Sequence, residues 1–347
     1  MRSRTQSRRP IQAPRPLKSG ANNQDAFGRR VSYLRLSLTD RCNLRCTYCL
    51  PLDARFTPRA DVLSASDLLR ISDAFIRRGT RKIRLTGGEP LLRPDIADIV
   101  RGLGRRLGDD LEELTLTTNA TRLAIHADML AEAGMRRINV SLDTLDPERF
   151  KRIARFGSLD RVLQGLNAAR SAGLRVRINT VLMKGGNEAE IPDLVAWAHS
   201  HGHDIALIEI MPMTGDADRS SYRPMTALQT ALQARFQLRH ETRTDAHPGP
   251  ARFARSEVTG HRVGFISALT DNFCADCNRM RVTATGRIYM CLGQDDHVDL
   301  REALAAPYPE DALDAAIGRA LSGKPERHNF DKVGRARPER FMSVTGG

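Results

Sequence analysis

The sequence of 347 residues lacks any apolar run near the ~18–20 residues that a membrane-spanning helix needs. No apolar stretch follows the basic residues at its N-terminus, so this end does not resemble a secretory signal. Aromatic residues are scarce, at 5% with a single tryptophan, and few side chains are therefore available for stacking on nucleic-acid bases. No internal repeat is present. These absences predict a cytoplasmic protein with no membrane partner and disfavour a nucleic-acid-binding one.

Cysteine is also rare, and the few cysteines are grouped. The six fall into two triplets with none left over: Cys42, Cys46 and Cys49 in a C-x3-C-x2-C run, and Cys274, Cys277 and Cys291. In a reducing cytoplasm, clustered cysteines are more often metal ligands than disulfides. Three thiolates are one short of a closed four-ligand site. The pattern therefore predicts two metal centres that each keep one position open for chemistry.

The net charge of +13 has a local and a general part. Residues 1–30 hold eight Lys or Arg and one acid, Asp25, in a context rich in Pro, Ser, Gln and Asn, so we expect a disordered basic arm over 1–30. The remaining excess would suit a polyanionic small molecule such as a nucleoside triphosphate. A general basic bias of composition would give the same excess.

Hydrophobic periodicity indicates an alternating α/β architecture. Residues 31–38 alternate, with leucines at 34, 36 and 38 on one face and Tyr33, Arg35 and Ser37 on the other, as in a strand. Five more strands are predicted, at 82–86, 113–118, 137–142, 175–182 and 204–211. Helical patterns separate them, near 68–76, 94–107, 123–134, 160–172 and 189–201. Six such units predict a parallel sheet in a partial, open (βα)6 TIM-like barrel over residues 31–215, with its chemistry at the carboxyl ends of the strands.

The pattern changes after residue 215. Residues 241–256 are polar, and short strands are predicted at 262–267, 279–284 and 287–291, followed by helices within 297–322 and an unstructured tail at 341–347. We therefore expect a C-terminal α+β extension over 216–347 that carries the second cysteine triplet and closes the open side of the barrel.

The first cysteine run, with Tyr48 before its third cysteine, resembles the radical S-adenosylmethionine enzymes. Gly87-Gly88-Glu89-Pro90, about 40 residues later, is similar to the glycine-glycine-glutamate segment of that superfamily. The resemblance implies a [4Fe–4S] cluster whose open iron is chelated by S-adenosylmethionine, and one-electron cleavage that yields a 5′-deoxyadenosyl radical. The implied cofactor contacts are Tyr48, Gly88, Glu89, Ser141 and Met211; Met211 also fits ordinary core packing.

The second triplet and the arginines after it, Arg279 and Arg281, resemble the GTP 3′,8-cyclase family of molybdenum cofactor biosynthesis over residues 31–347. The resemblance implies a second [4Fe–4S] cluster that holds the guanine base of GTP. The implied GTP contacts are Arg35, Arg84, Thr117, Arg177, Arg279 and Arg281, and the residues implied to be needed for catalysis are Arg279, Arg281, Gly346 and Gly347. Two positions depart from the family pattern: Arg177 replaces a common lysine, and Ala120 replaces a common glycine, which matters if residue 120 needs a positive φ.

The implied reaction abstracts the ribose 3′ hydrogen and joins C3′ to C8 of guanine. The product is (8S)-3′,8-cyclo-7,8-dihydroguanosine 5′-triphosphate, and one arginine is implied to assist reduction of the radical at the base. The implied partners are a reductant that the sequence does not identify, a downstream cyclic pyranopterin monophosphate synthase, and a second copy of the chain in a homodimer.

Two alternatives stay open on the residues alone. A radical peptide-modifying enzyme would carry auxiliary clusters in its C-terminal part, generally with more than three cysteines there. A zinc-dependent nucleic-acid-binding protein would account for the positive charge. A zinc site at the first triplet would need a local fourth ligand, and with no histidine between Gly28 and Ala124 only Asp40 or Asp53 is available.

Overall fold

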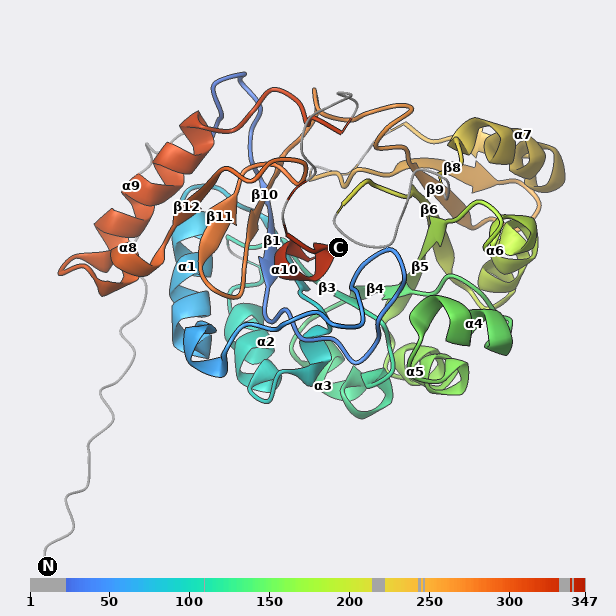
Figure 1. The fold of residues 1–347 in the computed structure, drawn as a ribbon, viewed down its shortest axis with the longest axis horizontal. Helices are drawn as coiled ribbons and strands as arrows, with labels where there is room; N and C mark the ends of the chain where they lie inside the picture. Colours follow the sequence, from blue (N-terminus) through green and yellow to red (C-terminus); the bar gives the residue numbers. More distant parts are fainter. Residues whose placement is uncertain are drawn as a thin grey trace, which may run out of the picture.

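The computed structural model describes residues 23–108, 110–213, 222–242, 245, 247–330, 338 and 340–346. Six strands alternate with helices in its first part, as the sequence predicts, and the helices form an arc on the outside of the sheet (Figure 1). The strands are β1 (Tyr33–Ser37), β2 (Lys82–Thr86), β3 (Glu113–Thr118), β4 (Arg137–Ser141), β5 (Arg175–Leu182) and β6 (Asp204–Glu209). The helices are α1 (Ala65–Arg77), α2 (Ile96–Gly104), α3 (Ala127–Glu132), α4 (Pro147–Ala154), α5 (Leu159–Ser171) and α6 (Ile191–Ser200).

The extension contributes strands to both edges of the sheet. The full order is β12-β11-β10-β1-β2-β3-β4-β5-β6-β9-β8-β7, with β10 parallel to β1 and β9 parallel to β6. Its elements are α7 (Met225–Phe236), β7 (Leu238–His240), β8 (Arg252–Ser256), β9 (Arg262–Ile266), β10 (Arg279–Val282), β11 (Arg287–Tyr289), β12 (His297–Asp299), α8 (Arg301–Ala305), α9 (Pro309–Ser322) and α10 (Met342–Thr345). The predicted partial barrel with an α+β extension is confirmed.

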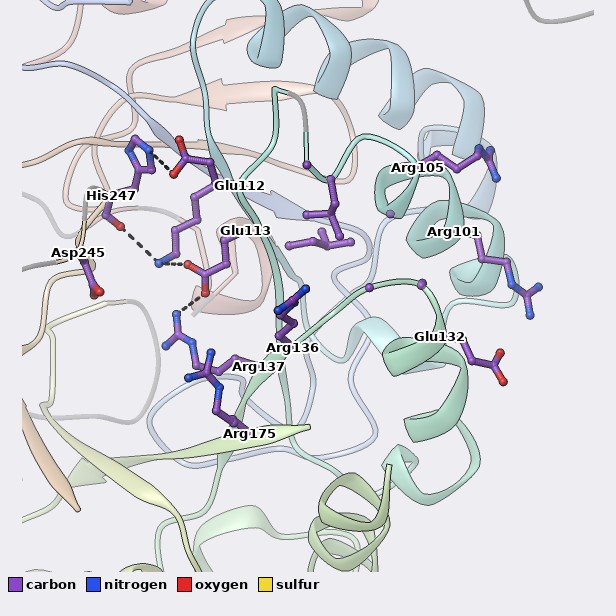
Figure 2. A pocket seen from close by; sticks show the side chains of 17 residues that line it. Arg101, Arg105, Glu112, Glu113, Glu132, Arg136, Arg137, Arg175, Asp245 and His247 are labelled. Atoms are coloured by element: carbon purple, nitrogen blue, oxygen red, sulfur yellow. Dashed lines mark hydrogen bonds and ion pairs between the residues drawn. The ribbon is translucent and has the colours of Figure 1, made fainter. Parts of the chain in front are cut away.

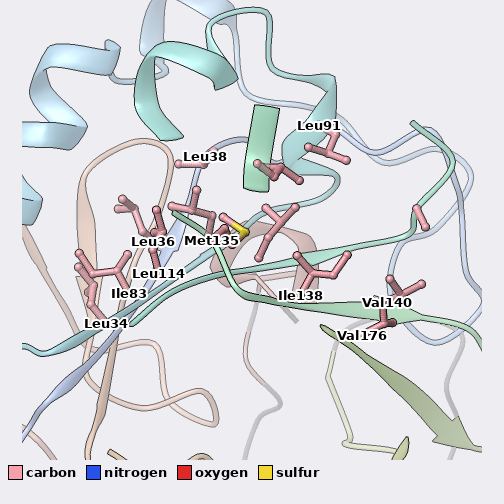
Figure 3. Close-up of a cluster of buried hydrophobic side chains, with 14 of the residues drawn as sticks. Leu34, Leu36, Leu38, Ile83, Leu91, Leu114, Met135, Ile138, Val140 and Val176 are labelled. Atoms are coloured by element: carbon pink, nitrogen blue, oxygen red, sulfur yellow. The ribbon is translucent and has the colours of Figure 1, made fainter. Parts of the chain in front are cut away.

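The alternation of side chains along β1 gives the sheet one apolar face and one polar face. Leu34, Leu36 and Leu38 are fully buried against the helices, together with side chains from the neighbouring strands (Figure 3). Burial of each such leucine contributes about 2 kcal/mol to folding. Tyr33 and Arg35 face the other way, into the concave interior of the barrel, which is therefore lined by polar groups.

Several sequence predictions need correction. Helix α4, the segment β7–β8 and helix α7 were not expected, because α4, β7 and β8 are short and α7 has little apolar periodicity. The segment predicted as helical at 297–322 begins with a strand, β12. The tail expected to be unstructured forms the short helix α10 at the centre of the concave side (Figure 1).

The prediction of a disordered arm over residues 1–30 is wrong for residues 23–30; residues 1–22 lie outside the described part. Asn23 and Asp25 are buried, and the carbonyl of Asn23 accepts a hydrogen bond from the amide of Val31 at 2.8 Å. The carboxylate of Asp25 accepts from the amides of Phe27 and Arg29, both at 3.0 Å. These bonds fix a turn, which composition alone does not reveal. No helix in the described residues is long and apolar enough to cross a membrane.

Candidate active site

The two cysteine triplets lie at opposite ends of strand β1. The first follows its carboxyl end, because Cys42 comes five residues after Ser37. The second lies at its amino end. Strand β10 pairs in parallel with β1, placing Arg279 beside Tyr33, so the loop before β10 that holds Cys274 and Cys277 sits at the amino end. Strand β11 returns antiparallel and brings Cys291 to the same end.

The loop of the first triplet is held by backbone hydrogen bonds from both sides. On one side, Arg45 and Thr47 donate to the carbonyls of Ala154 and Ile153, at 2.9 and 3.0 Å, at the end of α4. Burial raises the pKa of Cys42 to about 11 and that of Cys49 to about 12; the charge of Glu89 adds to the effect at Cys42, and those of Cys42 and Asp143 add to it at Cys49. Three buried thiols in one loop are costly to ionise unless cationic irons neutralise them.

The glycine-glutamate turn holds the other side of this loop. Gly88 donates to the carbonyl of Thr39 and Glu89 to that of Arg41, both at 2.7 Å. Neither glycine has room for a Cβ. At Gly87 it would lie 2.3 Å from the carbonyl oxygen of Thr39, and at Gly88 2.3 Å from that of Arg41. The glycines are therefore needed for close approach of two backbones, beside whatever they do for a cofactor.

The carboxylate of Glu89 is fully buried and points into the fold. It accepts hydrogen bonds from the amide of Leu91 at 3.0 Å, the hydroxyl of Thr118 at 2.8 Å and the amide of Asn119 at 2.7 Å. Burial nevertheless raises its pKa to about 7. Glu89 thus ties the turn after β2 to the end of β3. Next to it, Ala120 has a φ of 61°, so the departure from the family glycine falls at a position that does need positive φ.

Of the other predicted cofactor contacts, Tyr48 is the best defined. Its hydroxyl donates to a carboxylate oxygen of Asp143 at 2.8 Å, and burial raises the pKa of Asp143 to about 6. The ring packs on the small apolar cluster of Ile153, Met183 and Ile210. Ser141 ends strand β4, and Met211 follows β6, both half-buried at the carboxyl edge, the edge of the first triplet.

Cationic side chains hold the second triplet. Buried Lys324 donates to Cys277 Sγ at 3.4 Å and to the carbonyls of Arg279 and Met290 at 3.0 and 2.9 Å. Burial would raise the pKa of Cys277, but Arg279 and Lys324 lower it to about 6. Arg29 contacts the same loop, donating to the carbonyl of Cys274 at 2.8 Å. These cationic neighbours favour the thiolate form of Cys277.

Between the triplets, the predicted arginines line the barrel interior. The strand register places Arg281 beside Arg35 and Arg35 beside Arg84. One level higher, Arg177 lies beside Asn139, whose side-chain Oδ1 accepts hydrogen bonds from Arg177 Nε at 3.0 Å and Nη2 at 2.7 Å. Buried Nε atoms of Arg84 and Arg281 and the Thr117 hydroxyl have no hydrogen-bond partner among the described residues. Such a set is suited to an anionic ligand.

The C-terminal tail reaches the same interior. The amide of Ser343 hydrogen-bonds to Cys49. Gly346, with a φ of 75°, lies so close to β2 that a Cβ there would meet the hydroxyl of Thr86 at 2.0 Å. Gly347 lies outside the described residues. The structure thus brings Gly346 together with the first triplet.

Comparison with known proteins agrees with this geometry. The model of the radical SAM superfamily matches residues 36–198, and that of the Molybdenum Cofactor Synthesis C family matches residues 203–330. The GTP 3′,8-cyclase of Erythrobacter litoralis (strain HTCC2594) is 53% identical over 93% of this chain and 98% of its own length. That of Rhizobium etli (strain CIAT 652) is 51% identical over 93% and 94%. The chain belongs to the GTP 3′,8-cyclase family.

Solved structures share the fold of this GTP 3′,8-cyclase family member. Streptococcus suis SuiB bound to S-adenosylmethionine has a TM-score of 0.62 at 18% identity, covering 84% of this chain and 68% of that one. Native anSMEcpe with bound AdoMet has a TM-score of 0.58 at 15% identity, covering 90% and 88%. At these identities the likeness shows the fold alone.

The donor sets fit the clusters that radical S-adenosylmethionine enzymes use. Each thiolate of a four-iron cluster binds its own iron, so the three need not converge on a point. In the described residues, no three Cys, His, Asp or Glu side chains are arranged to hold a single ion. All six cysteines of the cyclase family member are free and partly buried, and the surroundings of Cys277 favour its thiolate, which suits thiolate ligation of a cluster.

Sequence reasoning missed several residues of this site. Lys82 lies two positions before Arg84 on the same face of β2, and the period of a strand would have found it. Arg29 and Lys324 come from segments far from the cysteines in the sequence, and no local pattern marks them. Both act on the second triplet only because the fold brings them there.

Proposed function

We propose that this protein is a cytoplasmic radical S-adenosylmethionine enzyme that converts GTP to (8S)-3′,8-cyclo-7,8-dihydroguanosine 5′-triphosphate, the first step of molybdenum cofactor biosynthesis. One observation carries the proposal. Two three-cysteine sites lie at opposite ends of β1, and the buried arginines Arg35 and Arg84 lie at a level of the sheet between them. A substrate held between them would be reached by a radical source on one side and a base-binding metal centre on the other.

In this proposal Cys42, Cys46 and Cys49 hold the first [4Fe–4S] cluster, beside Tyr48, Gly88, Ser141 and Met211 as contacts of S-adenosylmethionine. When bound, the cofactor and cluster supply a 5′-deoxyadenosyl radical. The chain itself orients and shields the reacting groups. The Tyr48 ring and the apolar cluster behind it exclude water, and the tail at Gly346 fills the space next to Thr86.

In this proposal Cys274, Cys277 and Cys291 would hold the second [4Fe–4S] cluster, which would supply a binding position for the guanine base of GTP. A base fixed at the second triplet would place the ribose beside the middle of β1, near Arg35 and at a defined distance from the first triplet. The lysine at 324 keeps the Cys274–Cys277 loop against the strand ends through its two carbonyl contacts.

The interior arginines would hold the triphosphate. Arg35 and Arg84 are buried, and half-buried Arg281 lies beside Arg35. Burial, together with the neighbouring arginines, lowers the pKa of Arg35 to about 9, and burial together with Arg279 lowers that of Arg281 to about 10. A polyanion in contact with them would relieve this cost. Arg177 presents a planar fork where the family commonly has lysine, so its phosphate contact would be shared between two nitrogens.

The proposal further includes an external one-electron reductant, a synthase that converts the cyclic product to cyclic pyranopterin monophosphate, and a homodimer. Anaerobic reconstitution followed by incubation with GTP, S-adenosylmethionine and a reductant tests its core. We expect about eight irons per chain and 5′-deoxyadenosine formation that depends on GTP. About four irons, or cofactor cleavage that is indifferent to GTP, would contradict it and favour a peptide-modifying enzyme.

A further inference from the structure

A cavity of about 920 Å³ opens at the amino ends of strands β2 to β5. This is the end opposite the first cysteine triplet. Arg136, Arg137 and Arg175 lie together around the cavity with Glu113, whereas Arg101 on α2 and Arg105 just after this helix point away from them (Figure 2).

At its inner end the cavity meets a small group of ion pairs. Lys82 Nζ lies 2.6 Å from a carboxylate oxygen of Glu113, and Arg137 pairs with the other oxygen of the same carboxylate. Burial would raise the pKa of Glu113, but Arg137 and Lys82 lower it to about 2, so the carboxylate stays charged. It neutralises two cations that would otherwise be costly to bury.

Behind this group lies a second, smaller cavity of about 40 Å³. Lys82, Arg137 and Asp245 line both cavities, so the two cavities share part of their walls. The inner one is also lined by Arg84 and Arg177, two of the predicted GTP contacts. Only the side chains of this shared wall therefore separate the outer cavity from the cavity that the interior arginines line.

The strand register extends this path to the second triplet. One level of the sheet runs from Arg281 through Arg35, Arg84 and Thr115 to Arg137 and Arg175, each residue paired with the next across neighbouring strands. The row begins on β10, next to the second triplet, and ends at the opening. A ligand with its base at the triplet would have its phosphates nearest the opening.

We propose that GTP enters through this cavity at the amino end of the barrel, base first, and that Arg136 and Arg175 form a vestibule that attracts its triphosphate. Ligands would then enter the barrel at both of its ends, and the nucleotide would enter at the end opposite the first cysteine triplet. The incoming triphosphate takes the place of the Glu113 carboxylate as the ion-pair partner of Lys82 and Arg137. This inference rests on the proposed function and adds a route and an electrostatic entrance to it.

Arg136 and Arg175 suit a test because both are exposed and neither makes an ion pair with a described carboxylate. The experiment follows association of GTP with the reconstituted enzyme through the spectrum of the second cluster. In Arg136→Glu/Arg175→Glu we expect the GTP association rate to fall about tenfold at low salt and to approach the wild-type rate at high salt. The cyclisation rate at saturating GTP should not change.

Two controls separate the entrance from a general defect. Guanosine lacks the triphosphate, so its association should be the same in the wild type and the double variant. Arg161→Glu changes an exposed arginine on α5, away from the cavity, and should leave GTP association unaltered. Unchanged GTP association in the double variant, or an equal loss with guanosine, would overturn the inference. Absence of any GTP effect in the wild type would overturn the proposed function, and this inference with it.

Discussion

Replacement of Gly88 by alanine tests how the first cysteine loop is held. No positive φ constrains this glycine, so the substitution isolates the effect of one added methyl group. The new Cβ would lie 2.3 Å from the carbonyl oxygen of Arg41 and 2.6 Å from that of Asp40. Both are backbone atoms directly before Cys42, and neither can rotate away as the end of a side chain would.

The cost follows from this geometry. Moving the contact from 2.3 Å to the 3.0 Å that real Cβ atoms respect requires the loop to shift by about 0.7 Å. Overpacking of this kind costs about 1–3 kcal/mol. The shift also lengthens the hydrogen bonds of Gly88 and Glu89 to the loop, worth about 1 kcal/mol each. We expect Gly88→Ala to lower stability by about 3 kcal/mol.

The shift should also displace Cys42 and weaken the first cluster. After anaerobic reconstitution, Gly88→Ala should retain about four irons per chain instead of about eight, and should still show a spectral response of the second cluster to GTP. Gly318→Ala is the matched control: this glycine lies in α9, the added Cβ would meet only Arg78 Nη2 at 3.8 Å, and alanine there should stabilise by about 0.5–1 kcal/mol. Full iron content and an unchanged melting temperature in Gly88→Ala would refute the reasoning.

Three further changes probe other parts of the site. Glu89→Gln removes a carboxyl whose pKa is raised to about 7 in the folded state; the wild type should therefore lose stability as pH rises from about 4.5 through 7. The variant lacks this pH-dependent contribution. The difference between the unfolding free energies of the wild type and the variant should therefore change over that pH window and stay constant above it. Lys324→Met removes the donor to Cys277 Sγ and should lower the reduction potential of the second cluster by about 50 mV, or roughly 1 kcal/mol per electron, whereas exposed Arg319→Met should not. Deletion of Gly346–Gly347 should abolish cyclisation while iron content stays at the wild-type value, and normal activity would contradict a role for the tail.

The regular part of the fold was readable from the sequence because its signals are local. Strands β2, β3 and β5 match the predicted bounds, since alternation within each strand suffices to mark it. The cysteines and the inward arginines were likewise found by spacing. The sequence could not predict that the extension adds strands to both edges of the sheet, because the pairing of β10 with β1 and of β9 with β6 joins segments far apart in the chain.

The same limit explains what the sequence could not say about the site. The chemistry was expected at the carboxyl ends of the strands, yet the second triplet and the row through Arg35 lie at the amino end and mid-strand, because β10 runs parallel to β1. Residue 120 shows a finer limit. Its positive φ depends on how the turn after Asn119 packs on Glu89, which no one-dimensional pattern reports.

In the proposed enzyme the two triplets hold different partners, the radical source at one end and GTP at the other. Electron paramagnetic resonance of a variant with Cys42, Cys46 and Cys49 changed to alanine tests this division most directly, because only the second cluster then contributes a signal. We expect GTP to shift this signal and S-adenosylmethionine to leave it unchanged. A spectrum that is unchanged by GTP, or one that responds to S-adenosylmethionine instead, would contradict it.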